Sequence, residues 1–399
     1  MTNVIYVYPW DIVGDPRAPA RLRSLGVDSV ALAATYHATR AATPLHPAHR
    51  LVDARYAACY VPVREEAWKD ARLVPAVPAE WTASADPFGE AAAALRAEGL
   101  PVHAWTVLTH NSLLGSADPG LVVVNAFGEP YPYALCPASQ EVRDYCHTLV
   151  GEIVELGEPD GLILEACGAL GLRHAGLHEK TDGADWSPVQ IALLSLCFCR
   201  TCRTRYESAG VDVSELTSRV RAGVDRASGS APASVEEALG DLAQAVRTLR
   251  TGLARELRDP LTARIRSARP GMPLALHADA DPWATGSFAT VSTSGTVDAD
   301  LLIGNCWNDP EADMAGLRAL RRLGEPNRPD APYRPAEPGR LGPRIGAYVL
   351  ALPPRPADGA ALSRLAGGYR AAGADEIHWY HGGLVSAARL KAIGQAVRE

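Results

Sequence analysis

An apolar run near the middle of the chain ends in a single acid. Residues 160–165 read DGLILE, so the run at 162–164 stops at Glu165. If the run is a buried strand, Glu165 lies at its carboxyl end, where a carboxylate is costly unless it is paired or functional. A partly dry pocket raises the pKa of a carboxyl group, as a general acid requires at neutral pH. We therefore predict that Glu165 is a general acid/base.

A second carboxylate is expected in the segment LHADADPW, at 276–283. In a strand register His277, Asp279 and Asp281 alternate with apolar residues, so the three share one face. Asp281 also fits an Asx-type turn before Pro282, and this reading suits it better than Asp279. We therefore favour Asp279 as the nucleophile, or as the base that activates water.

Aromatic and hydrogen-bonding residues recur where other strand-like runs end. Flat apolar faces beside amide and imidazole groups suit a polyhydroxylated ring, whose C–H face stacks while its hydroxyls find partners. A lone histidine is more often a core residue, and the recurrence at strand ends favours a functional role here. The predicted substrate-binding residues are Asp11, His37, His110, Asn111, His277, Asn305, Trp307, His378 and Tyr380.

Three cysteines are closely spaced in LCFCRTCRTRYE, at 196–207. The spacing Cys-x-Cys-x2-Cys, formed by Cys197, Cys199 and Cys202, suits a structural Zn²⁺ that has one further ligand. Cys136, His174 or His178 could be that ligand. The alternative is a set of reduced, packed thiols. No Cys/His pairing indicates a catalytic cysteine.

Eight strand-like runs position these residues, mostly with helical pattern between them. Runs of this kind predict parallel βα units, and their number predicts an α/β (β/α)8 TIM barrel, with a doubly wound sheet as the rival fold. No GxGxxG follows the first run, and no Walker loop occurs. The runs lie at 4–8, 29–33, 102–108, 161–164, 273–276, 300–303, 345–350 and 376–380.

Three long segments interrupt the pattern, at 38–85, 112–140 and 168–271. In a barrel they follow strands 2, 3 and 4 at the carboxyl end, where active sites are built. We predict a single catalytic domain over 1–399 that contains a helical, cysteine-bearing insertion at 168–271. The helices at 233–267 could also pair two copies into a homodimer.

Composition limits the classes of partner. The 399 residues carry a formal net charge of −7 and no Lys/Arg-rich run, so nucleic acid and anionic membrane are poor partners. The first residues lack a signal-peptide pattern, and no apolar run reaches membrane-spanning length. We therefore expect a cytoplasmic protein with reduced cysteines that acts on a small molecule or an oligosaccharide.

The order of several motifs resembles that of (β/α)8 glycoside-hydrolase-like proteins, including the group that contains β-galactosidases with a cysteine cluster. The motifs are PWD at 9–11, ATYHATR at 34–40, VVNAFGEPYPYALCP at 123–137, DGLILEA at 160–166 and CFCRTCRTRYE at 197–207. In the large retaining clan, the resemblance implies an acid/base Glu at the end of strand 4, usually after Asn, and a nucleophile Glu at the end of strand 7.

This chain matches that pattern at Glu165, although Leu164 stands in place of Asn. The seventh run, RIGAYVLALPP, carries no carboxylate. Another acid such as Asp279 then serves, or the mechanism inverts, or the protein no longer hydrolyses glycosides.

Three functional hypotheses remain open. The first is a glycoside hydrolase that uses Glu165 and Asp279 without a catalytic cofactor. The second is a metal-dependent sugar isomerase, epimerase or lyase, in which four histidines and Asp279 converge on a divalent ion. The third is a non-catalytic sugar-binding relic on the same scaffold. The four histidines of the second hypothesis are His37, His110, His277 and His378.

Overall fold

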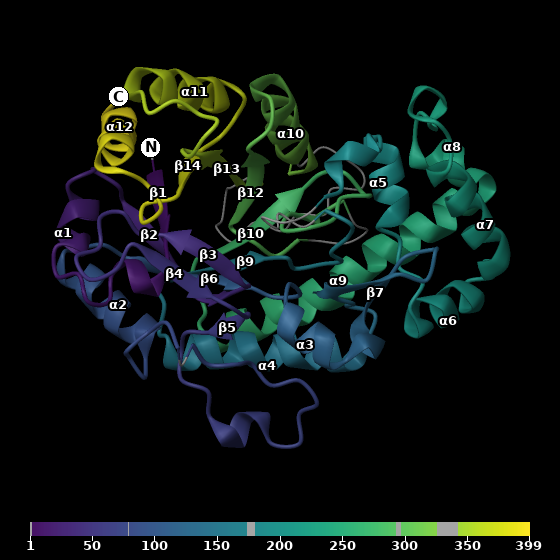
Figure 1. The fold of residues 1–399 in the computed structure, drawn as a ribbon, viewed down its shortest axis with the longest axis horizontal. Helices are drawn as coiled ribbons and strands as arrows, with labels where there is room; N and C mark the ends of the chain where they lie inside the picture. Colours follow the sequence, from purple (N-terminus) through teal and green to yellow (C-terminus); the bar gives the residue numbers. More distant parts are fainter. Residues whose placement is uncertain (1, 79, 174–179, 293–296, 325–341) are drawn as a thin grey trace.

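The computed structural model describes residues 2–78, 80–173, 180–292, 297–324 and 342–399 (Figure 1). Eight parallel strands form a closed barrel, because β1 pairs with both β14 and β2. The predicted TIM barrel is confirmed, and every expected run contributes one strand. In barrel order the strands are β1 (Thr2–Val7), β2 (Ser29–Tyr36), β6 (Val102–Val107), β9 (Gly161–Glu165), β10 (Leu274–Asp279), β12 (Leu301–Cys306), β13 (Arg344–Leu350) and β14 (Glu376–Tyr380).

Burial on both faces explains why the strands read as nearly continuous apolar runs. Every residue of β2 and β9 is buried, because barrel side chains fill the interior while helices cover the outside. Three of the covering helices begin at an Asp whose side chain accepts a backbone N–H of the first turn: α2, α10 and α11. The covering helices are α1 (Ala18–Arg23), α2 (Pro87–Ala97), α4 (Gln140–Leu156), α9 (Ala243–Ala268), α10 (Pro310–Leu323), α11 (Gly359–Ala371) and α12 (Ala387–Arg398).

Extra elements follow the carboxyl ends of β2, β6 and β9, as the insertions predicted. The segment after β2 forms the hairpin β3 (Thr39–Ala42) and β4 (Leu51–Ala54), followed by β5 (Ala58–Cys59). The segment after β6 contains α3 (Ser112–Ala117) and the hairpin β7 (Val122–Val124) and β8 (Pro130–Leu135).

The segment after β9 is mainly helical. Its short helices α6, α7 and α8 lie together beside the barrel, away from the chain termini (Figure 1). His174 and His178 lie outside the described residues. The elements that precede α9 are α5 (Pro188–Leu194), α6 (Arg200–Ser208), α7 (Val213–Val224) and α8 (Val235–Leu239), while the short strand β11 (Ala289–Thr290) follows β10.

A helix that crosses a bilayer needs about 20 consecutive, mainly apolar residues. Within the described part of the chain, no helix is long and apolar enough to cross a membrane.

Substitution of Phe88 tests how tightly the helical layer packs on the barrel. This first-turn residue of α2 is fully buried, and we expect Phe88→Ala to lower the free energy of unfolding by about 3–5 kcal/mol because it leaves a cavity. Phe127→Ala is the matched control, since Phe127 is 36% exposed and the same truncation there should cost less than about 1 kcal/mol. Chemical denaturation measures both. Equal losses would contradict the packing described.

Candidate active site at the carboxyl end of the barrel

Glu165 is the last residue of β9 and is only 4% exposed. The indole Nε1–H of Trp105 on β6 donates to its Oε2 at 2.7 Å. His277 Nδ1 on β10 lies 3.4 Å from the same oxygen, at ion-pair distance. The two neighbouring strands therefore direct both groups at one carboxylate oxygen, as a buried charge requires.

The surroundings of Glu165 set the direction of its pKa. Burial raises the pKa, but the nearby His277 ring outweighs it, together with the charge of His37 and the Trp105 hydrogen bond. The net pKa lies below the ordinary Glu value. The resting carboxyl group is therefore ionised at neutral pH, whereas the sequence suggested a raised pKa.

Aromatic side chains form a wall beside this carboxylate. The Tyr380 hydroxyl lies 3.1 Å from the Tyr8 hydroxyl and 3.5 Å from that of Tyr36. The Trp307 ring packs on Tyr380, with ring centroids 4.8 Å apart. Tyr380 and Trp307, two of the predicted binding residues, thus lie together. Their hydroxyl and indole groups add hydrogen-bonding capacity to flat apolar faces.

Asp11 lies in a 3-10 turn, Pro9–Asp11, directly after β1. Its Oδ2 accepts the backbone N–H of Tyr8 at 2.8 Å. Burial raises the pKa of Asp11 to about 7, against the opposing effects of that N–H and of Arg21. A Cβ on Gly383 would lie 2.0 Å from this carboxyl group, so only glycine fits there. Asp11 is therefore a tightly enclosed carboxyl group that titrates near neutral pH.

Asp279 ends β10 and is half-buried. Its Oδ1 accepts the backbone N–H of Asp281 at 2.8 Å, while Asp281 in turn accepts that of Trp283 at 2.9 Å. Both acids therefore form Asx-type turns, a role that the sequence suggested more strongly for Asp281 than for Asp279. Burial, with the nearby charge of Asp281, raises the pKa of Asp279 against its backbone hydrogen bonds. No hydrogen bond joins Asp279 to Glu165 among the described residues.

The remaining predicted binding residues have different surroundings, and some of them have a structural role. We call the carboxyl end of the barrel strands the mouth of the barrel. His37 and His110 stack with ring centroids 4.2 Å apart, and His37 Nδ1 donates to the Ala38 carbonyl at 2.9 Å. Asn111 caps α3 by accepting the Leu114 N–H at 3.0 Å, which is a structural use of its side chain. Asn305 Oδ1 and Trp307 Nε1 have no hydrogen-bond partner among the described residues. His378 lies deeper, inside the barrel.

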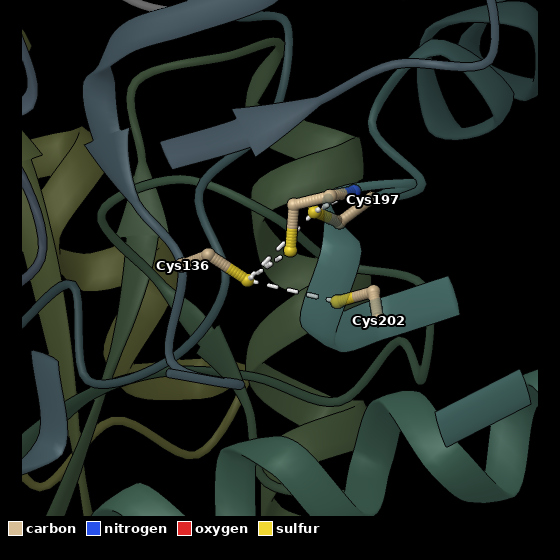
Figure 2. Close-up of side chains that lie close together, drawn as sticks. Cys136, Cys197 and Cys202 are labelled. Carbon is tan, nitrogen blue, oxygen red and sulfur yellow. Dashed lines mark hydrogen bonds between the residues drawn. The ribbon is translucent and has the colours of Figure 1, made fainter. Parts of the chain in front are cut away.

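A second cluster consists of four buried cysteines, and Figure 2 labels three of them, Cys136, Cys197 and Cys202. Cys136 follows β8, and the other three, Cys197, Cys199 and Cys202, surround the start of α6. The Cys136 Sγ lies 3.7 Å from that of Cys197, 3.8 Å from that of Cys199 and 3.6 Å from that of Cys202. Cys136 is thus the fourth member, chosen from the three candidates that the sequence left open. Such a group could hold a metal ion.

The hypothesis of a histidine-rich catalytic metal site finds no support in this geometry. Among the described residues, the four cysteines are the one group of three or more His, Cys, Asp or Glu ligand atoms close enough together for a metal ion. The four histidines and Asp279 do not gather in that way. His37 and His110 stack on each other, with His37 Nδ1 bonded to the Ala38 carbonyl. His277 and His378 each contact the Tyr6 hydroxyl, and Asp279 accepts the backbone N–H of Asp281.

Sequence reasoning missed the residues that hold Glu165 in place. Tyr6 and Trp105 lie within strands, where an aromatic residue looks like ordinary core. Their position on the inward face of their strands was the available signal, because barrel interiors gather such side chains in layers.

Comparison with known proteins supports the fold. No protein-family model and no curated protein sequence matches the chain. The glycoside hydrolase domain of PgaB (BpsB) from Bordetella bronchiseptica is 16% identical and aligns with a TM-score of 0.58 over 100% of this chain and 99% of that one. The catalytic domain of a β-amylase from Paenibacillus polymyxa is 11% identical, with a TM-score of 0.52 over 99% and 97%.

A β-galactosidase from the psychrophilic Marinomonas ef1 is 15% identical, with a TM-score of 0.52. The match covers 100% of this chain but only 59% of that longer one. These solved structures are all glycoside hydrolases. At such low identity they establish the barrel fold that this chain shares with them.

Trp105→Phe should raise the pKa of Glu165, because it removes the indole N–H that stabilises the carboxylate. Trp379→Phe is the matched control, since its Nε1–H donates to Asn3 instead. Carboxyl ¹³C NMR titration, assigned with Glu165→Gln, measures the shift. Equal titrations for Trp105→Phe and the wild type would contradict the proposed role of the indole.

Proposed function

We propose that this protein is a glycoside hydrolase whose active site lies at the carboxyl end of the barrel. The observation that carries the proposal is the buried Glu165 at the end of β9, contacted by Trp105 and His277. A buried carboxylate at the carboxyl end of a barrel strand is typical of a functional residue. The aromatic wall beside it suits a sugar ring, and the resemblance to glycoside hydrolases in fold agrees with this function.

The directions of the two pKa shifts favour different catalytic roles for Glu165 and Asp279. Glu165 has a lowered pKa and serves at rest as the carboxylate that attacks the sugar or activates water. Asp279 has a raised pKa and is favoured as the acid that protonates the leaving oxygen. Asp11, with a pKa of about 7, is the second candidate for the general acid. These roles reverse the assignment made from sequence.

Substitution of Glu165 tests the proposal on a panel of aryl glycosides. Glu165→Gln should lower kcat/KM by at least about 100-fold on any glycoside that the wild type cleaves, because the amide neither attacks nor accepts a proton. Glu152→Gln is the matched control, since Glu152 on α4 is also buried but pairs with Arg64.

Unchanged turnover in Glu165→Gln would remove this residue from the mechanism. A wild-type protein that binds sugars but cleaves none of the panel would favour the non-catalytic alternative instead. Asp279→Asn and Asp11→Asn, measured on the same panel, identify the acid.

We further propose that the four cysteines bind a structural Zn²⁺. A tetrahedral ion with Zn–S bonds of about 2.3 Å requires sulfur atoms about 3.8 Å apart. The distances from Cys136 to the other three sulfur atoms are 3.7, 3.8 and 3.6 Å, which fit that geometry. Four protein ligands complete the coordination, so the ion would join the β7–β8 segment to α6 without supplying chemistry to the barrel mouth.

Metal analysis tests the zinc proposal. The purified protein should contain about one zinc per chain, and Cys136→Ser should lose it and melt at a lower temperature. Cys59→Ser is the control, since Cys59 is also buried but lies on β5, outside the cluster. A wild-type protein purified without chelator that takes up no zinc would contradict the proposal.

A further inference from the structure

A buried arginine on α9 lies beside the cysteine cluster. Arg250 is 9% exposed and lines one cavity together with Cys136, Cys197 and Cys202. Among the described residues, its guanidinium group forms no ion pair with an Asp or Glu, and its Nε–H has no hydrogen-bond partner. An arginine keeps its charge inside a protein, and a buried charge requires a counter-charge.

Two other arginines near α9 show the usual solution. Arg205 also lines the cavity and pairs with Glu256, with 2.7 Å between Nη2 and Oε2. Arg258 is buried on α9 itself and pairs with Asp259, also at 2.7 Å. Arg250 therefore differs from both in the partner that it lacks.

The guanidinium group of Arg250 donates instead to three backbone carbonyls. Nη1 lies 3.5 Å from the Ser195 oxygen, while Nη2 lies 3.4 Å from the Trp283 oxygen and 3.1 Å from the Ala284 oxygen. Carbonyl oxygens carry only partial charges, and the two longer contacts are weak. The three carbonyls therefore hold the arginine in place without neutralising it.

The surroundings of Arg250 leave few sources of full negative charge. Burial lowers its pKa, and the groups that oppose this shift are Tyr206, Asp281, Cys197 and Cys202. Tyr206 stays neutral, since burial raises its own pKa, and Asp281 is exposed, so that water screens its charge. The cavity measures about 20 Å³, which is room for about one water and too little for an anionic ligand. The cysteine cluster is the buried counter-charge that is left.

Metal binding gives the cysteine cluster that charge. Zn²⁺ binds cysteines as thiolates, and four thiolates outweigh the two positive charges of one ion. Without a metal, reduced cysteines are mainly neutral thiols at neutral pH, and Arg250 has no counter-charge of its own. The arginine and the metal-bound cluster therefore stabilise each other.

We propose that Arg250 is the counter-charge of the metal-bound cysteine cluster, and that it links metal binding to the position of the loop after β10. This loop contains Trp283 and Ala284, whose carbonyls Arg250 holds, and its Asx turns begin at Asp279. Arg250 is thus a positioning residue. The inference rests on the proposed zinc site, and its consequence for Asp279 in catalysis rests on the proposed hydrolase activity.

Zinc affinity of the full-length protein tests the counter-charge. Competition with a chelating dye for Zn²⁺ compares the wild type with Arg250→Met and Arg250→Lys. Arg250→Met removes the charge and should weaken zinc binding by about 10–100-fold. Arg250→Lys keeps the charge and should stay within about threefold of the wild type. Arg258→Met is the matched control and should also stay within about threefold, because Arg258 has its own carboxylate.

Amide hydrogen exchange tests the link to the loop. Removing zinc from the wild type with a chelator should speed exchange at 283–286 by at least about 10-fold, because Arg250 no longer holds the loop. In Arg250→Met, exchange there should be fast with zinc bound and should change little when zinc is removed. Arg250→Lys should lose this coupling too, because an ammonium group lacks the fork that reaches carbonyls on both segments.

Glu236→Ala is the control for a loop that is merely loosened. Glu236 on α8 accepts the Trp283 indole N–H at 2.8 Å, so its removal frees the loop from a contact outside the cysteine cluster. This variant should speed exchange at 283–286 and leave the zinc affinity unchanged.

The outcomes separate this inference from the proposals on which it rests. Equal zinc affinities for Arg250→Met and the wild type would overturn the counter-charge, while the zinc site itself would stand. An effect of zinc on loop exchange that persists in Arg250→Met would overturn the link. A wild-type protein that binds no zinc would overturn both the zinc site and this inference. Absence of glycosidase activity in every variant would bear on the proposed hydrolase function alone.

A further variant keeps the test decisive if Arg250→Met fails to fold. Arg250→Gln also removes the charge but keeps an amide that can donate to a carbonyl. It should weaken zinc binding as Arg250→Met does, and an affinity equal to that of the wild type would contradict the proposal.

Discussion

A buried carboxylate at the end of β9 is the constraint on which the barrel interior depends. Glu165 keeps its charge there only because Trp105 and His277 reach it from the two neighbouring strands. Those partners require supports of their own, and Tyr6 supplies one by bonding His277 from across the barrel. The aromatic packing around them excludes water, which strengthens each of these interactions. The site and the core are therefore the same set of side chains.

The closed barrel makes this arrangement possible because parallel strands bring residues from distant parts of the chain to one level. Additional elements after β2, β6 and β9 surround the mouth, and the helices after β9 include the start of α6 with its cysteines. The cysteine cluster brings together the segment that follows β6 and the segment that follows β9. In the proposed account, the cysteines would stabilise the surrounding loops, and the acids would supply the chemistry at the carboxyl end of the barrel.

Much of the fold could be predicted from sequence because it depends on local patterns. Each apolar run forms a strand in the structure. Glu165 could be identified because it is the acid that ends the apolar run at 162–164. The direction of its pKa could not be predicted, because it depends on Trp105, which is 60 residues away, and on His277. Tyr6 was missed because an inward aromatic residue on a strand resembles core. Cys136 was found only as one candidate of three, since its separation of 61 residues from Cys197 is not a motif.

The central claim is that Glu165, at the carboxyl end of the barrel, takes part directly in cleavage of a glycosidic bond. The most direct test is a crystal structure of the Glu165→Gln variant with an intact oligosaccharide that the wild type cleaves. The anomeric carbon of the bond to be cleaved should lie about 3–3.5 Å from the side chain at position 165, or one ordered water away from it, with a sugar ring against Trp307 or Tyr380. An oligosaccharide bound in a productive pose elsewhere, with position 165 out of reach, would contradict the claim.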